Sequence, residues 1–316
     1  MRHRRPATKA SDEIGRLEGR VIAGYGRHLL VEDEEGNEFK CVPRGRRLRV
    51  VCGDQVLWIP GEHDSPAIVE EILPRRTTLT RPDRRGREEV LAANVDQLLV
   101  VCAPKPAFDP FIIDRYLVAA ELMGVDAAVV CNKQDLDELA EAQDMPGICK
   151  QYERAGYPVL WTSAKHGTGT EQIVDLVKGN TNILVGQSGV GKSSIINALV
   201  PAADVLVGRL SHGSGEGRHT TTASMLHHLP GGGDLIDSPG VRDYAPHLER
   251  TQDLSVGFLE FRQPAMDCHF SNCRHLEEPR CAVKAAVTLG QISKRRYRSY
   301  VMLTRRQENL NQDPAL

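Results

Sequence analysis

Short runs of alternating apolar and polar residues fill the first part of the chain, from about residue 19 to residue 74. Turn-forming residues separate the runs, which read RVIAGYG, HLLVED, EEGNEFKCV, GDQVLWIP and AIVEEILP. Alternation over so few residues is typical of half-buried β-strands. Five such strands at this spacing predict a small all-β barrel.

The pattern changes to strands alternating with helices between about residues 93 and 244. Near-continuous apolar runs, VDQLLVVCA, DAAVVCN, YPVLWTS and TNILVG, are typical of strands buried on both faces of a parallel sheet. The segment DPFIIDRYLVAAELMG has Asp109 to cap a helix, Pro110 at its first position and Gly124 at its end. We therefore expect a doubly wound α/β domain.

The last part of the chain, after about residue 248, has only helical patterns and a cysteine–histidine cluster. Ser293 is placed to cap a final basic helix that bears Tyr297 and Tyr300. The predicted organisation is a basic tail (1–16), a barrel (17–74), a basic linker (75–92), an α/β domain (93–247) and a helical domain (248–316).

Composition adds a soluble, globular character to this multidomain picture. The 316 residues are 41% hydrophobic and 26% charged, with a net charge of −2. No apolar stretch approaches the roughly 20 residues that cross a bilayer. The first ten residues, MRHRRPATKA, lack the apolar segment of a secretory signal. We expect a cytoplasmic protein without a membrane partner.

Basic residues gather in four runs despite the near-neutral total, at residues 2–9, 44–49, 75–87 and 294–306. Patches on several segments indicate a polyanionic partner that is touched at several points. Solvated faces and a disordered tail are the alternative for each run. Arginines in the connections of the barrel favour an oligonucleotide-binding (OB) type, and a purely structural barrel is its alternative.

A glycine-rich turn follows the apolar run at residues 182–194, which read NILVGQSGVGKSS. It fits GxxxxGK[ST], in which backbone N–H groups and a helix N-terminus hold phosphates, Lys192 reaches the outer phosphates and Ser193 ligates Mg²⁺. Lys192 is also the expected catalytic cation. The nucleotide-binding residues predicted here are Gly186, Gln187, Ser188, Gly189, Val190, Gly191, Lys192, Ser193 and Ser194.

The base is predicted from NKQD, which comprises Asn132, Lys133, Gln134 and Asp135 after an apolar strand. Asp135 can accept hydrogen bonds from N1–H and the 2-amino group of guanine, and the Lys133 stem can lie along the ring. Adenine lacks both donors, so a buried Asp135 would be unpaired against ATP.

A second base-contacting element, TSAK, includes Ser163, Ala164 and Lys165 and also follows an apolar strand. A backbone N–H near Ala164 could meet the guanine O6.

Residues 237–240 read DSPG and fit the DxxG element of nucleotide hydrolases. In that element Asp237 would hold Mg²⁺ and the Gly240 N–H would sense the γ-phosphate. A threonine of GEGRHTTTASM, residues 215–225, would complete the Mg²⁺ shell when GTP is bound.

The order of these elements is rotated along the chain. In ordinary GTPases the phosphate loop comes first and the base-reading elements last, whereas here NKQD and TSAK come before it and DSPG after it. A compact domain tolerates such a rotation when its termini lie close together. The sequence therefore predicts a circularly permuted GTPase domain.

These motifs, with the cluster CHFSNCRHLEEPRC, resemble those of the bacterial circularly permuted GTPases of late small-ribosomal-subunit maturation, the ribosome small subunit-dependent GTPase A family. The resemblance covers nearly the whole chain. It implies an OB barrel, a permuted GTPase domain and a zinc-bearing helical domain. It also implies Thr221 as the switch threonine and Mg²⁺ ligand, and a monomer that binds the subunit and its rRNA.

The residue directly after DxxG is Val241, which cannot hydrogen-bond the attacking water as glutamine does in many GTPases. The resemblance implies His219 as the catalytic group that replaces it. An imidazole titrates in a range that suits this role near neutrality.

The eight cysteines fall into two groups. Five lie in segments with strand-like or helical patterns and are expected to be ordinary buried thiols: Cys41, Cys52, Cys102, Cys131 and Cys149. The others form C-x4-C-x-H-x5-C with Cys268, Cys273, His275 and Cys281, a closed Cys₃His set suited to one structural Zn²⁺. His269 could replace His275 on spacing alone, and the resemblance selects His275. Three free thiols are the alternative.

The sequence thus predicts a GTPase that uses GTP and Mg²⁺, yields GDP, and leaves the small subunit after hydrolysis. Two alternatives remain: a P-loop ATPase or kinase that acts on a small molecule, and a passive RNA-binding scaffold with a vestigial nucleotide site.

Overall fold

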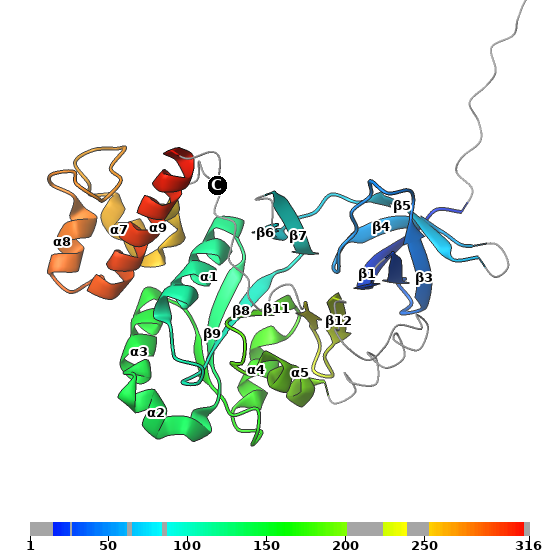
Figure 1. Cartoon of the computed structure of the whole chain (residues 1–316), viewed down its shortest axis with the longest axis horizontal. Helices are drawn as coiled ribbons and strands as arrows, with labels where there is room; N and C mark the ends of the chain where they lie inside the picture. Colours follow the sequence, from blue (N-terminus) through cyan, green and yellow to red (C-terminus); the bar gives the residue numbers. More distant parts are fainter. Residues whose placement is uncertain are drawn as a thin grey trace, which may run out of the picture.

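The computed structural model describes residues 15–25, 27–61, 65–83, 87–200, 224–238 and 253–312. They form a barrel, an α/β domain and a helical region, arranged side by side with the α/β domain in the middle (Figure 1). Of the predicted residues, Thr221, His219, Gly240 and Val241 lie outside the described ranges, as does most of the basic tail.

The N-terminal barrel has the strand order β1-β2-β3-β5-β4, and β4 pairs back with β1. β3 and β5 are parallel, and the other neighbours are antiparallel. Val21, Val31, Val56 and Trp58 fill the interior. This closed five-stranded arrangement confirms the OB-type barrel. Its strands are β1 (Leu17–Tyr25), β2 (His28–Glu32), β3 (Glu38–Pro43), β4 (Gln55–Ile59) and β5 (Ala67–Ile72).

The predicted basic linker contains an antiparallel hairpin that the sequence did not indicate. It consists of β6 (Thr78–Pro82) and β7 (Glu88–Ala93). Leu79, Leu91 and Ala92 belong to the hydrophobic core that also lies beneath the α/β sheet. This part of the chain is therefore anchored to the α/β domain by apolar packing.

The α/β sheet has the order β10-β9-β8-β11-β13-β12, with parallel neighbours except for β12. One core cluster joins the sheet to α1 and α3, and another joins its opposite face to α4 and α5. The doubly wound prediction is confirmed. The strands are β8 (Gln97–Cys102), β9 (Asp126–Cys131), β10 (Val159–Trp161), β11 (Thr181–Val185), β12 (Ser224–His228) and β13 (Asp234–Asp237), and the helices are α1 (Pro110–Met123), α2 (Asp137–Ala142), α3 (Met145–Ala155), α4 (Thr170–Val177) and α5 (Lys192–Leu199).

The ends of α1 follow the sequence prediction. The Asp109 side chain accepts a hydrogen bond from the Phe111 N–H, Pro110 opens the helix, and Gly124 closes it in the left-handed conformation. The five scattered cysteines are buried and free, as predicted.

The described part of the C-terminal region is helical and contains no strand. Its elements are the short η3 (Leu254–Gly257) and η4 (Leu259–Phe261) and the helices α7 (Arg262–Ala265), α8 (Ala282–Thr288) and α9 (Lys294–Gln312). Ser293 caps α9, because its Oγ accepts from the Arg296 N–H at 3.4 Å. Among the helices that the structure describes, none combines the length and apolar character that a bilayer crossing demands.

The tyrosines of α9 pack inward. The Tyr297 hydroxyl donates to the His275 carbonyl at 2.7 Å, and the Tyr300 hydroxyl donates to the Arg274 carbonyl. Of the two roles left open for them, packing and base stacking, the structure shows packing.

The basic run of α9 does not present all its charges to solvent as the sequence suggested. Arg296 is fully buried, and its guanidinium binds both Glu260 oxygens, at 2.7 and 2.8 Å, and Asp114 at 2.9 Å. Arg295 binds Asp114 as well, at 2.7 Å. These arginines join α9 to α1 and η4, because a buried guanidinium must keep acidic partners.

Candidate nucleotide site and metal cluster

The glycine-rich turn connects the end of β11 with the start of α5. It lies where the parallel strands have their carboxyl ends, which we call the sheet edge. Gly186 has φ +138°, and a Cβ there would lie 2.2 Å from the Val101 carbonyl oxygen. Gly191, directly before α5, has φ +100°. Both positions require glycine, because the backbone is left-handed and an atom of a neighbouring segment lies too close for a Cβ. The turn therefore presents backbone N–H groups and the N-terminus of α5 at this edge.

Lys192 is buried and folds back over this turn. Its Nζ donates to the carbonyl oxygens of Gly186 at 2.6 Å and Gln187 at 2.8 Å. The ammonium group is therefore held inside the loop, where a cation suits phosphate oxygens. Ser193 and Ser194 are exposed in the first turn of α5.

Asp237 ends β13, the strand next to β11. Ile236 pairs with Ile183 in the parallel ladder, so Asp237 lies level with Leu184, two residues before Gly186. Asp237 is thus on the same sheet edge as the phosphate loop, and its carboxylate is of the type that binds Mg²⁺. Ser238 follows it and shares a 2.8 Å hydrogen bond with Ser224 of β12.

Asn132 follows β9 and joins three segments of the site. It is buried, and its Nδ2 donates to the Val190 carbonyl at 3.0 Å. Its Oδ1 accepts from the Ala164 N–H at 3.1 Å and from the Thr162 hydroxyl at 3.3 Å. NKQD, TSAK and the phosphate loop are therefore fixed to one another by a single amide side chain.

Lys133 extends along the same junction. Its backbone is left-handed, with φ +62°, and its Nζ donates to the carbonyl oxygens of Lys105 and Gly189 at 2.7 Å each. The stem therefore spans the distance from NKQD to the phosphate loop. Lys105 supports the site without belonging to any motif, and sequence reasoning missed it.

Asp135 lies in η1 (Gln134–Leu136), and its Oδ1 accepts from the Ser163 hydroxyl at 2.6 Å. This hydrogen bond lowers the pKa of the carboxyl group, which keeps it ionised. The Asp135 side chain is exposed, as are those of Gln134 and Lys165. The short helix η1 stands beyond the sheet edge, where solvent reaches these groups.

Cys268, Cys273, His275 and Cys281 come together, with their ligand atoms within 4.8 Å of one another. His275 Nδ1 is 3.6 Å from Cys268 Sγ and 3.4 Å from Cys281 Sγ, and these two sulfurs are 3.9 Å apart. Tetrahedral zinc bonds predict about 3.8 Å between two sulfurs and about 3.5 Å between sulfur and nitrogen. The cluster therefore has a geometry that could bind zinc. His269 is outside it and contacts Arg280.

Comparison with known proteins agrees with this architecture. The model of the family described as RsgA GTPase matches residues 72–246. The chain belongs to the RsgA GTPase family.

Relatives named small ribosomal subunit biogenesis GTPase RsgA match most of the chain. The one from Azotobacter vinelandii is 43% identical over 286 residues, which cover 89% of this chain and 83% of the relative. The one from Shewanella oneidensis is 44% identical over 287 residues, which cover 89% and 81%.

Two solved structures share the fold. YjeQ from Thermotoga maritima has a TM-score of 0.72 and 33% identity, covering 92% of this chain and 98% of YjeQ. YloQ, described as a circularly permuted GTPase, has a TM-score of 0.71 and 27% identity, covering 96% and 98%. The predicted circular permutation is thereby confirmed for this RsgA GTPase.

Proposed function

We propose that this chain hydrolyses GTP to GDP and phosphate and acts in the biogenesis of the small ribosomal subunit. The observation that carries the nucleotide assignment is the junction at Asn132, which holds the base-reading elements against the phosphate loop. The names of the relatives support the ribosomal role.

The proposed roles of Lys192, Ser193 and Asp237 are supported by their places at the sheet edge, and those of Thr221 and Gly240 by the sequence motifs alone. Lys192 stabilises the charge that develops on the transferred phosphoryl group, and backbone N–H groups from Gly186 to Ser194 share this task. Ser193, Asp237 and Thr221 would hold Mg²⁺, which would supply neutralisation of the phosphate charge. The Gly240 N–H senses the γ-phosphate.

His219 orients the attacking water in this proposal, because the hydrophobic Val241 cannot. His219→Ala should then remove most of the turnover stimulated by small subunits while GDP affinity is retained. An unchanged stimulated rate in this variant would assign the water to another group.

Guanine is selected by Asp135, with Ser163, Ala164 and Lys165 completing the base site. The carboxylate accepts from donors that adenine lacks, and its bond to Ser163 orients it for this purpose.

The Cys₃His cluster holds one structural zinc ion in this proposal. Its four ligands leave no position for a reacting water, so the metal stabilises the helical domain. Tyr297 donates to the His275 carbonyl and Tyr300 to the Arg274 carbonyl, which connects the cluster to α9.

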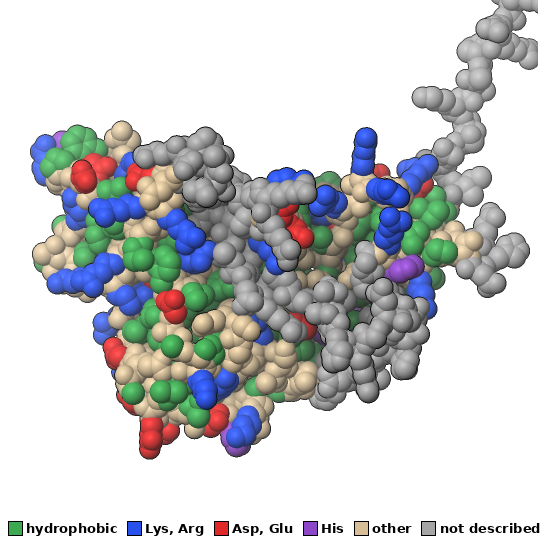
Figure 2. Space-filling view, viewed as in Figure 1, with side chains coloured by type: hydrophobic (Ala, Val, Ile, Leu, Met, Phe, Trp, Pro, Cys, Tyr) green, Lys and Arg blue, Asp and Glu red, His purple; other side chains and the backbone are tan. Residues whose placement is uncertain are grey.

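The barrel contributes an RNA-binding surface. Arg44, Arg46, Arg47 and Arg49 are exposed between β3 and β4, and Lys40 is exposed on β3. Figure 2 shows blue side chains gathered over the barrel as well as over the helical region. Such groups suit rRNA phosphates. The factor is a cytoplasmic monomer that binds the subunit with GTP and leaves after hydrolysis.

GTP turnover with and without purified small subunits tests this function, with ATP as a competitor. Stimulated hydrolysis with strong preference for GTP is expected. Equal competition by ATP would favour an ATPase or kinase, and subunit binding without turnover would favour a passive scaffold. The ordered phosphate loop with its buried Lys192 disfavours the passive scaffold with a vestigial nucleotide site.

A further inference from the structure

We propose that Arg20, a residue of the barrel, is a positioning residue for GTP hydrolysis. Two strands of the α/β sheet lead to the phosphate loop and to Asp237, and Arg20 binds both of them to the barrel. The barrel thereby sets the rate of turnover. This inference rests on the proposed function and names a residue through which the barrel acts on the site.

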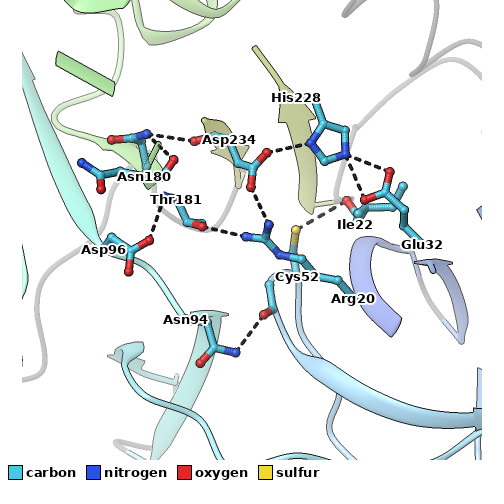
Figure 3. A network of polar contacts seen from close by, with 12 residues as sticks. Arg20, Ile22, Glu32, Cys52, Asn94, Asp96, Asn180, Thr181, His228 and Asp234 are labelled. Atoms are coloured by element: carbon cyan, nitrogen blue, oxygen red, sulfur yellow. Dashed lines mark hydrogen bonds and ion pairs between the residues drawn. The ribbon is translucent and has the colours of Figure 1, made fainter. Parts of the chain in front are cut away.

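Arg20 bridges the first residues of two adjacent strands of the α/β sheet (Figure 3). Its Nη1 donates to Asp234 Oδ2 at 2.5 Å, and its Nη2 donates to Thr181 Oγ1 at 2.8 Å. Thr181 and Asp234 begin β11 and β13 and pair with each other in the ladder. β11 runs on into the phosphate loop, and β13 ends at Asp237. One guanidinium therefore fixes the starts of both functional strands.

The contact continues as a ring of acidic and basic residues between barrel and sheet, closed by the pairing of Arg20 with Glu32 in the barrel ladder. His228 of β12 has its Nδ1 2.6 Å from Asp234 Oδ1 and its Nε2 2.9 Å from Glu32 Oε1. Glu32 belongs to β2 and stands opposite Arg20 in the barrel ladder. Figure 3 shows the four side chains converging, two from each domain. Their directional bonds set the orientation of the domains more strictly than apolar packing would.

β1, the barrel strand that carries Arg20, also pairs with the other end of β12. Ala23 and Gly24 of β1 stand opposite Met225 and Ser224, and Met225 stands opposite Asp237 in the next ladder. β12 is therefore held between the barrel and the Asp237 strand, by side chains at His228 and by backbone at Ser224. The barrel and the α/β domain share one continuous sheet.

This continuity gives Arg20 an effect on the reaction. Asp234 and Asp237 are three residues apart on one strand, about 10 Å at about 3.3 Å per residue. A strand transmits a displacement of its first residue to its last, since its ladders are stiff. Misplacement of a catalytic group by about 1 Å can cost about a hundredfold in rate. Loss of the Arg20 bonds should therefore slow hydrolysis, although Arg20 touches no base-reading residue.

The test compares Arg20→Gln with the wild-type chain for turnover with purified small subunits, GDP affinity and co-sedimentation with the subunits. We expect stimulated kcat to fall roughly ten- to a hundredfold. KM, GDP affinity and co-sedimentation should change far less than kcat, because the base-reading residues of NKQD are untouched and the phosphate loop keeps its own backbone N–H donors. Arg20→Lys should recover part of kcat, since an ammonium reaches Asp234 but does not present two parallel donors.

Arg16→Gln is the matched control, because Arg16 pairs at 2.9 Å with Glu70 inside the barrel and leaves the sheet alone. It should keep the wild-type rate. If Arg20→Gln fails to fold, Glu32→Gln tests the ring instead. This variant should also lower the stimulated kcat. Wild-type kcat in the folded Arg20→Gln or Glu32→Gln protein overturns the inference. Absence of stimulation in the wild type would instead overturn the proposed function.

Discussion

Asn132 and Gly191 fit directly against each other where the base-reading and phosphate-holding segments meet. A Cβ on Gly191 would lie 2.2 Å from Asn132 Nδ2, the atom that donates to the Val190 carbonyl. The contact couples the two halves of the site, because a change at one residue displaces the other.

We predict that Gly191→Ala lowers GTP and GDP affinity at least tenfold. The variant must hold alanine at φ +100°, which costs about 1–3 kcal/mol, and must also push Asn132 from its hydrogen bonds. Titration with a fluorescent GDP analogue measures the loss. Gly179→Ala is the matched control, since Gly179 has φ +77° with nothing within 4 Å of its Cβ position. Equal losses of nucleotide affinity in the two variants would mean that backbone strain, and not the contact with Asn132, causes the loss.

Asp135→Asn should remove the preference for guanine. The neutral amide no longer accepts two charge-assisted hydrogen bonds, each of which contributes about 1.5–3 kcal/mol, so GDP affinity should fall by about a hundredfold or more. Calorimetry with guanosine and adenosine diphosphates measures the selectivity. Xanthosine diphosphate should bind the variant better than wild type, because its C2 carbonyl accepts from the new amide. Asp137→Asn, an exposed change two residues away, should keep guanine selectivity.

Zinc should depend on His275 and not on His269. His275 Nδ1 lies 3.4 Å from Cys281 Sγ within the cluster, whereas His269 Nε2 is 3.0 Å from Arg280. His275→Ala should lose stoichiometric zinc in metal analysis and melt at a lower temperature, because metal binding contributes to folding. His269→Ala should keep one zinc ion and the wild-type melting temperature. Full zinc content in His275→Ala would remove His275 from the ligand set.

Arg296→Met should destabilise the helical region by about 3–5 kcal/mol, since Glu260 and Asp114 lose a buried partner. Urea unfolding measures the change in free energy. Arg298→Ala, an exposed change on the same helix, should cost under about 0.5 kcal/mol. Adding Glu260→Gln to Arg296→Met should recover part of the loss, and no recovery would contradict the charge argument.

The sequence predicted those parts of the fold whose signals are local. β8, β9 and β11 are long apolar runs, and motif residues directly follow β9 and β11, so the sheet edge and the site could be predicted together. β12 and the β6–β7 hairpin were missed because they are short and interrupted by histidines or basic residues. No local signal could indicate that Arg296 is buried, since its acidic partners lie 36 and 182 residues away. The partnership of Lys133 with Lys105 was hidden for the same reason.

The ring at the barrel junction should make stability depend on pH through His228. Glu32 of β2 and Asp234 of β13 face its imidazole, and His227 is its neighbour on β12. Burial lowers the pKa of His228, but the hydrogen bonds to Asp234 and Glu32 outweigh this effect and raise it above its ordinary value of 6.5. The imidazolium is therefore favoured more in the folded state than in the unfolded state.

A raised pKa in the folded state gives a stabilisation that is complete below pH 6.5 and is lost as the pH rises through the folded pKa. The wild type should thus melt at a higher temperature than His228→Gln in mildly acidic buffer, and the difference should shrink at alkaline pH. Because the side chain is 54% exposed, solvent screening keeps the effect to a few degrees at most. Melting curves of both proteins between pH 5.5 and 8.5 measure it. A difference that grows with pH would mean that His228 joins the two domains as a neutral ring.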